Sequence, residues 1–162
     1  MELDAQEQNF VDKIAEYDSM IMHVASRADE DWQYPFSYTT GLFEKFQHPE
    51  IIVCGWKSKF AHAILNNLRD EIREGIRRFE PGQRYREVIA DFDVEFVPVS
   101  FENLKAHFGW GIWYYRKIVL LDQPFPALQL VWPSKPEGAF PWDENWPEDQ
   151  SVYQPLLGER KM

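Results

Sequence analysis

Apolar side chains recur along this sequence at two spacings, one typical of helices and one typical of strands. Residues 3–17 place an apolar side chain at about every third or fourth position, which predicts an amphipathic N-terminal helix. Residues 57–79 keep this spacing for longer and stop before Pro81-Gly82, so we expect a long helix that ends at this turn. Gly75 falls within that helix, where a glycine suggests close packing.

Shorter segments show the patterns of strands. Residues 20–26 predict one strand, and residues 36–40 predict another in which aromatic and hydroxyl side chains alternate. Residues 50–55 are apolar on both faces, which is typical of an interior strand covered on both sides. Residues 85–100 alternate from Phe92 to either side of Pro98 and predict one or two strands, in which the proline indicates an edge position or a strand end. Residues 127–132 predict a buried strand.

The remaining segments are less regular. Residues 101–108 predict a short helix capped by Ser100. Residues 110–122 are dense in aromatic side chains and fit either a helix or a strand. Residues 133–157 carry prolines and tryptophans too often for either, so we expect an extended tail. Its expected anchors are Trp142, Trp146 and Tyr153.

This order of elements predicts an α+β fold in a single domain that spans residues 1–162. A largely antiparallel sheet would be packed by the N-terminal helix and by the long helix at about 57–79, with an extended Pro/Trp-rich C-terminal segment. Residues 1–31 form an acidic helix and strand in front of a core that spans residues 32–155.

Composition narrows the class of protein. The 162 residues are 44% hydrophobic and 16% aromatic, which favours a packed core over disorder. No run approaches the roughly 18 apolar residues that span a bilayer, and "MELDAQEQNF" at the start lacks the apolar centre of a secretion signal. A single cysteine, Cys54, leaves no internal disulfide. We therefore expect a cytoplasmic protein without a membrane partner.

The net charge of −10 is concentrated at the N-terminus. Residues 1–31 hold nine acidic and two basic side chains, whereas the rest of the chain holds eighteen and fifteen. Such a surface repels nucleic acid, because phosphate binding needs clustered lysine and arginine. The acidity therefore serves either solubility alone or recognition of a basic protein partner.

Residue patterns for metals, cofactors and covalent catalysis are absent from the sequence. The four histidines show no HExxH or His-x-His spacing, and Gly109-Trp110-Gly111 lacks the strand and third glycine of a dinucleotide fingerprint, so we expect neither metal nor cofactor. Ser37, Thr39 and Cys54 are the possible nucleophiles, with His48 or His107 as base. No Gly-x-Ser-x-Gly elbow exposes Ser37, so ordinary strand positions explain Ser37 and Thr39 better, and Cys54 fits a small buried thiol within an apolar strand.

The sequence also contains "FSYTTGLFEKFQHPEIIVCG", "AILNNL", a "PG" turn at 81–82, "ALQLVWP" and a late "PW". In this order, over residues 32–155, these motifs resemble the domain-of-unknown-function 4262 family of bacterial proteins. The resemblance implies a shared fold. It implies no activity and no catalytic residues, because none is established for the family.

Within "FSYTTGLFEKFQHPEIIVCG", two positions keep a functional interpretation. His48 and Glu50 lie two residues apart and can share a face of a strand. One hypothesis is therefore an enzyme or small-ligand-binding protein with a pocket near the YTTGL and HPE segments. Its candidate catalytic residues are Tyr38, Thr39, His48 and Glu50.

The second and preferred hypothesis is a non-catalytic binding protein, because large aromatic side chains stand beside acidic ones in "DEDW" and "PWDENWPED". Tryptophan and tyrosine are enriched at interface hot spots. The most concrete version is an immunity-type inhibitor that neutralises a bacterial toxin by direct contact. The candidate partner-binding residues are Asp29, Glu30, Asp31, Trp32, Trp142, Asp143, Glu144 and Trp146.

Overall fold

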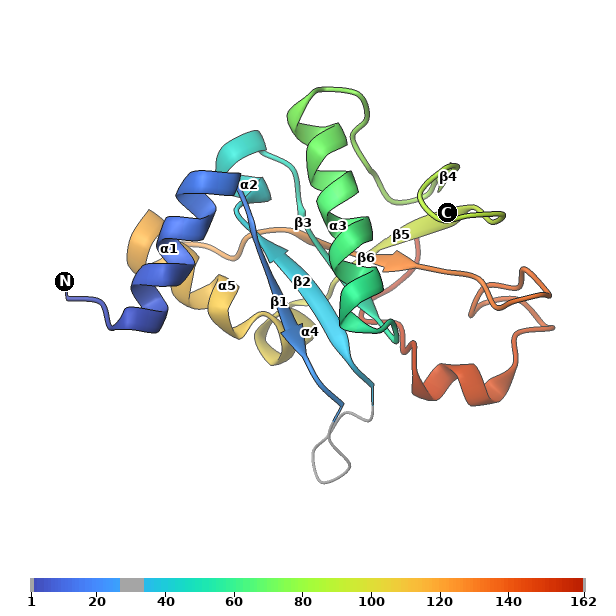
Figure 1. The fold of residues 1–162 in the computed structure, drawn as a ribbon. Helices are drawn as coiled ribbons and strands as arrows, with labels where there is room; N and C mark the ends of the chain where they lie inside the picture. The colour runs from blue at the N-terminus through green and yellow to red at the C-terminus, as the bar shows by residue number, and fades with distance from the viewer. Residues whose placement is uncertain (1, 27–33, 162) are drawn as a thin grey trace.

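The computed structural model describes residues 2–26 and 34–161, and in this part of the chain six strands form one sheet (Figure 1). The strand order is β1-β2-β3-β6-β5-β4. Every neighbouring pair is antiparallel except β3 and β6, which are parallel. This confirms the predicted α+β class with a largely antiparallel sheet. The strands are β1 (Met20–Val24), β2 (Phe36–Thr40), β3 (Glu50–Cys54), β4 (Arg84–Tyr85), β5 (Val94–Pro98) and β6 (Ala127–Val131).

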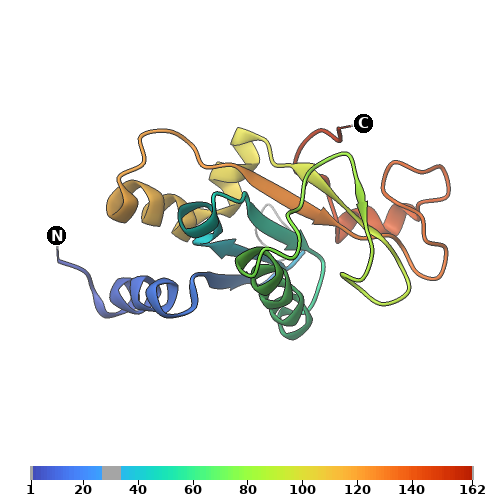
Figure 2. The ribbon, with the colours of Figure 1, turned by 90° about the horizontal axis from the view of Figure 1, so that it is seen from above.

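Helices cover both faces of the sheet (Figure 2). Helix α3 packs on one face, whereas α1, α4 and α5 contribute to the apolar cluster on the other. The predicted N-terminal helix and the predicted long helix are both confirmed. The helices are α1 (Ala5–Tyr17), α2 (Leu42–Phe46), α3 (Ser58–Arg73), α4 (Phe101–His107), α5 (Gly109–Tyr114), the π-helix η1 (Tyr115–Val119) and the 3₁₀ helix η2 (Glu148–Val152).

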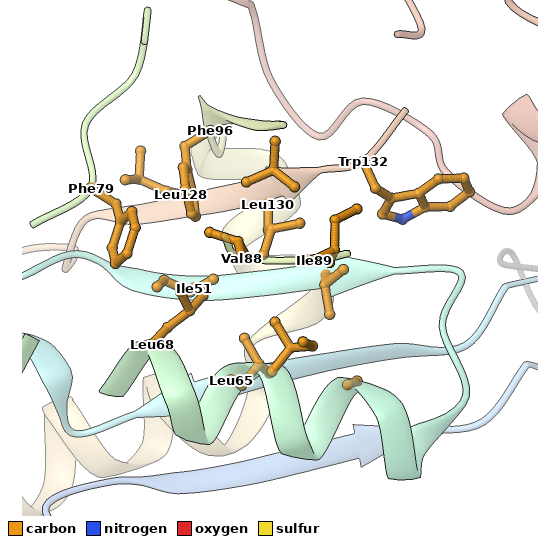
Figure 3. Close-up of a cluster of buried hydrophobic side chains, with 14 of the residues drawn as sticks. Ile51, Leu65, Leu68, Phe79, Val88, Ile89, Phe96, Leu128, Leu130 and Trp132 are labelled. Atoms are coloured by element: carbon orange, nitrogen blue, oxygen red, sulfur yellow. The ribbon is translucent and has the colours of Figure 1, made fainter. Parts of the chain in front are cut away.

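The larger core lies between α3 and the sheet (Figure 3). Leu65 and Leu68 of α3 point at Ile51 of β3, and Leu128 and Leu130 of β6 extend the same layer. Burying each such side chain contributes about 1.5–3 kcal/mol. Both faces of β3 and β6 are buried, which confirms that these two apolar segments are interior strands.

Helix α3 is shorter than its hydrophobic pattern predicts, because it ends at Arg73 instead of Phe79. Gly75 follows with a φ of 74°, a left-handed conformation that ends helices at little cost in glycine. A Cβ at Gly75 would meet no atom within 4 Å, so the expectation of close packing there was wrong. Ile76 continues the apolar spacing but is 66% exposed.

Three other segments bear on the predicted elements. Pro98 stands at the end of β5, beyond the two residues of β4 that pair with that strand, which confirms a strand end. Ser100 caps α4 through a 3.2 Å hydrogen bond from the Asn103 amide to its hydroxyl, as predicted. The ambiguous residues 110–122 are largely helical, as α5 and η1.

Two buried glutamines attach the C-terminal segment to β6. Gln129 Nε2 donates to the Pro155 carbonyl, and Gln129 Oε1 accepts from the Leu157 amide, both at 2.8 Å. Gln154 makes a similar pair of bonds to the main chain of Trp132. Trp146 is buried and anchors the tail as expected, whereas Tyr153 is 49% exposed and does not.

Replacing Gln129 with leucine should destabilise the protein. Q129L keeps the volume but leaves a buried carbonyl and a buried amide without partners, which costs about 2–4 kcal/mol. Urea unfolding measures this cost, and limited proteolysis should cut the tail faster. The control Q83L lies at an exposed position and should change little. A loss below about 1 kcal/mol for Q129L would contradict a stabilising role of the two hydrogen bonds from Gln129 to the C-terminal segment.

Candidate functional site

The carboxylate of Glu50 lies buried where β2, β3, α2 and η1 meet, and it accepts five hydrogen bonds. The acceptor is the first residue of β3, and the donors come from three other segments of the chain. This group is the most highly coordinated polar side chain of the predicted catalytic set. Its donors are Thr39 Oγ1 at 2.8 Å, the Gly41 amide at 2.9 Å, the Leu42 and Phe43 amides at 3.2 Å each, and the Tyr115 hydroxyl.

The three amide donors belong to the turn that opens α2. The first amides of a helix have no partner within the helix, and they carry a partial positive charge that favours a carboxylate. Gly41 makes this turn possible, since its φ is 121° and a Cβ would lie 2.6 Å from the Asp18 carbonyl oxygen. Glu50, at the start of β3, therefore caps the N-terminus of helix α2.

The hydrogen-bond directions indicate an ionised Glu50. The Thr39 hydroxyl accepts from the Ile51 amide at 2.9 Å, and the Tyr115 hydroxyl accepts from the Glu44 amide at 3.1 Å. Each hydroxyl proton is thus free to point at Glu50, and all five partners act as donors. Burial raises the pKa of Glu50, while bonds from Tyr115, Thr39 and the amides oppose that rise. Burial and the Glu50 charge also raise the pKa of Tyr115.

His48 is buried and points at different partners from those of Glu50. Its Nδ1–H donates to the Pro49 carbonyl at 2.8 Å, and its Nε2 accepts from the Phe79 amide at 3.0 Å. These two bonds are compatible only with the neutral ring protonated on Nδ1. Burial lowers the pKa of His48, which favours the same neutral form. His48 thereby fixes the chain that follows α3.

Tyr38, Thr39, His48 and Glu50 do not form one cluster. Thr39 and Glu50 share a hydrogen bond, whereas the Tyr38 hydroxyl accepts from the Trp110 amide at 3.1 Å. All four side chains are at most 1% exposed, and burial raises the pKa of Tyr38 to about 12. The geometry accounts for each of them as a structural hydrogen-bonding group.

A second set of polar side-chain contacts joins three residues that lie far apart in the sequence. Ser37 Oγ lies 2.7 Å from His23 Nδ1, and His23 Nε2 lies 3.2 Å from His62 Nδ1 on α3. Burial and the neighbouring His62 lower the pKa of His23. This order resembles a nucleophile, a base and an orienting group. Ser37 is only 2% exposed, however, and the Cys54 thiol is buried with a raised pKa.

Two kinds of feature, a cluster of metal ligands and a membrane-spanning helix, are absent from the described residues. Within residues 2–26 and 34–161, no three His, Cys, Asp or Glu side chains gather as metal ligands. In the same part of the chain, no helix is both long and apolar enough to cross a membrane.

A surface groove of about 420 Å³ runs between the start of α3 and the C-terminal segment, which we call the aromatic groove. Figure 1 shows this segment leaving β6 and turning back toward the N-terminal end of α3. Trp56 and Phe60 pack edge to face on one side of the groove, with ring centroids 4.7 Å apart. Trp132 forms part of its lining, and Pro147 and Asp149 lie where η2 begins.

The candidate partner-binding residues separate in the structure. Trp146 packs against Trp132 at 6.0 Å, beneath the aromatic groove. Trp142 lies on the opposite face of the sheet, where it stacks on Phe140 and Arg160. Asp143 accepts a hydrogen bond from the Phe140 amide at 2.9 Å, and Glu144 is exposed. The other four, Asp29, Glu30, Asp31 and Trp32, lie outside the described residues.

Comparison with known families gives one match. A family model described as a domain of unknown function, DUF4262, matches residues 13–147, which is most of the chain. The chain belongs to the DUF4262 family. The match begins within α1 and takes in β1, whereas the sequence motifs placed the resemblance over residues 32–155. No curated protein and no solved structure matches. Membership in DUF4262 therefore supplies no function.

The main residues missed by the sequence analysis are Tyr115, His23 and the pair Trp56 and Phe60. Tyr115 belongs to residues 110–122, which fit either a helix or a strand. The sequence therefore does not predict on which side of the segment the Tyr115 side chain lies. Trp56 and Phe60 carry a usable signal, because two aromatics four positions apart at a helix start lie on the same side. Phe60 belongs to the apolar spacing of α3 and is nonetheless 45% exposed.

Replacing Glu50 with glutamine should destabilise the protein strongly. E50Q turns one acceptor oxygen into an NH₂ group that faces existing donors, which costs about 3–5 kcal/mol. Urea unfolding of E50Q against wild type measures the effect. The control E44Q changes a partly exposed carboxylate that accepts from the Tyr114 hydroxyl, and it should lose much less. Equal stability of E50Q and wild type would refute an ionised cap.

His48 should make the protein less stable as the pH falls from 7 to 5. A folded-state pKa below 6.5 means that the unfolded chain binds the proton more readily, so stability is lost as the pH falls through 6.5. Each such proton contributes a slope of about 1.4 kcal/mol per pH unit. His23 and His107 act in the same direction, whereas the raised pKa of Glu50 acts in the opposite one.

The variant H48Q should therefore be less stable at pH 7 and show a smaller pH slope than wild type. Urea unfolding at a series of pH values measures both quantities. The control F79L removes a ring that packs against His48 but keeps the titrating group, so its slope should match wild type. An unchanged slope in H48Q would show that His48 does not titrate differently in the folded protein.

Proposed function

We propose that this DUF4262 protein is a non-catalytic binding protein that recognises a basic protein partner through the aromatic groove. The most concrete version is an immunity-type inhibitor that neutralises a bacterial toxin by direct contact. The observation that carries the proposal is a groove lined by the partly exposed Trp56 ring, the exposed Phe60 ring and Trp132, with acidic side chains at the same groove.

The floor of the groove is held in place before any partner arrives. Trp132, which lines the groove, donates from Nε1 to the Cys54 carbonyl at 2.8 Å, and Trp146, which packs against Trp132, donates from Nε1 to Ser151 Oγ at 2.9 Å. Gly55 allows this arrangement, because a Cβ there would lie 2.9 Å from the Trp132 ring. A preorganised aromatic surface loses little conformational entropy on binding, which favours slow dissociation.

The charges at the groove favour a cationic partner. Glu137 and Asp149 line it together with one cation, Lys135, whose ammonium lies 5.7 Å from the centroid of the Phe92 ring. A lysine or arginine side chain over Trp56 would gain a cation–π contact and a neighbouring carboxylate. The net charge of −10 would steer such a partner toward the protein and hasten encounter.

An inhibitor of this kind needs a complementary surface and no catalytic group. The buried hydrogen-bond network of Glu50 suits that role, since it makes a stable scaffold. A toxin that acts on nucleic acid has a basic active site, which is the kind of surface that an acidic, aromatic groove would cover.

The test begins with affinity capture from the native cells, using wild type and the double variant W56A/F60A as baits, followed by mass spectrometry. We expect one stoichiometric basic partner that wild type retains and the double variant loses. The matched control F101A removes an aromatic ring that is 47% exposed elsewhere, and it should retain the partner. Retention by W56A/F60A would exclude the groove, and no stoichiometric partner would refute the proposal.

With the purified partner, charge reversal should act on the rate of association. D149K and E137K should each lower the association rate constant about tenfold at low salt and less at high salt. W56A should instead raise the dissociation rate constant. Biolayer interferometry separates the two rates. Association that is unaffected by D149K and E137K would refute electrostatic steering at this groove.

One observation favours the alternative of a small-ligand-binding protein. The Tyr115 hydroxyl donates to Glu50, while the same residue lines a cleft of about 610 Å³ on the outer side. A pocket thus lies next to the YTTGL and HPE segments, one side chain away from Glu50.

A further inference from the structure

This cleft lies between α4, the turn formed by α5 and η1, and residues 121–125 that lead into β6. Figure 2 shows that the segment between η1 and β6 arches outward on the side of α4 and α5. The volume of about 610 Å³ is within the range of about 300–1,000 Å³ typical of small-molecule sites. We call it the α4–η1 cleft.

The floor of the α4–η1 cleft is apolar and fixed. Leu104, Tyr115 and Phe125 are each less than 5% exposed, and the Tyr115 and Phe125 rings pack at 4.6 Å. Tyr115 opens the π-helix η1, and its hydroxyl is held by Glu50 and by the Glu44 amide. Single π-helical turns occur frequently at functional sites. The floor therefore offers a preformed surface for an apolar group.

The rim of the cleft carries a net positive charge, opposite in sign to the net charge of the whole protein. Lys105 and Arg116 line it, against one acidic residue, Asp122. The Lys105 ammonium lies 4.6 Å from the centroid of the Phe101 ring, and within the described residues no ion pair engages either cation. In a protein with a net charge of −10, two exposed cations beside an apolar cleft mark a place where an anion is favoured.

We propose that the α4–η1 cleft binds a small amphipathic carboxylate. Its acyl or aryl body would lie on Leu104 and Phe125, and its carboxylate would pair with the Arg116 guanidinium, which matches a carboxylate in a bidentate geometry. Lys105 adds a second positive charge, and Gln123 lies at the same rim. This site is independent of the proposed partner site, because the cleft and the aromatic groove share no lining residue.

The test uses octanoate as probe with the full-length protein. Two-dimensional ¹⁵N NMR should show shifts concentrated at residues 101–125, and titration should give a dissociation constant. Octylammonium, which has the same tail and the opposite charge, and acetate, which has the same head and no tail, should bind this site at least about tenfold more weakly. Equal binding of octanoate and octylammonium, or shifts centred on the aromatic groove, would overturn the proposal.

Charge variants sharpen the test. R116E should weaken octanoate binding about tenfold or more, R116Q should weaken it less, and D122N should strengthen it a few-fold. The matched control K117E changes an exposed neighbour that does not line the cleft, and it should stay within about twofold of wild type. If K117E and R116E weakened octanoate binding equally, the effect would come from the net charge of the protein, and the proposed site would be refuted. Unfolding curves show that each variant is folded.

Discussion

A charged carboxylate in the centre of a protein is tolerated only where donors surround it, and Glu50 imposes that constraint on this fold. Its five hydrogen bonds tie β3 to β2, to the first turn of α2 and to η1. Each of these segments presents a hydrogen-bond donor to the same carboxylate. Because desolvating an ion costs several kcal/mol, the arrangement allows little variation. Gly41 and Tyr115 are thereby fixed together with Glu50, although they belong to distant parts of the chain.

This constraint explains why a stretch rich in reactive residue types is mostly architectural. Thr39, His48 and Glu50 each form hydrogen bonds to buried groups of the same chain. Two of the hollows at the surface of the described residues differ in the balance of their charged side chains. The aromatic groove is lined by Glu137 and Asp149 against Lys135, whereas the α4–η1 cleft is lined by Lys105 and Arg116 against Asp122. Tyr115 connects the network to the cleft, so the rigidity of the buried carboxylate extends to a surface where a ligand can lie.

The spacing of apolar side chains along the sequence predicted many of the helices and strands. It failed in segments whose buried side chains do not recur at a regular spacing. The strands at 36–40 and 50–54 and helix α3 follow from side-chain spacing, because one face of each packs on a core. Residues 110–122 remained undecided because aromatic side chains there point to several neighbours at once, so no single period emerges. The end of α3 was misplaced because Gly75 adopts a left-handed conformation before the apolar spacing stops. Backbone geometry, and not hydrophobicity, ends this helix.

The sequence by itself determined the order and type of most elements, the interior position of β3 and β6, and membership in the DUF4262 family. These features depend on neighbours within a few residues or on a motif order. Only the tertiary structure decided which groups meet. Glu50 and Tyr115 are 65 positions apart, and His48 and the Phe79 amide are 31 apart. Trp142 and Trp146 lie on opposite faces of the sheet despite their proximity in sequence. The reason is physical: spacing encodes which face is apolar, whereas pairing of polar groups depends on how the chain folds back on itself.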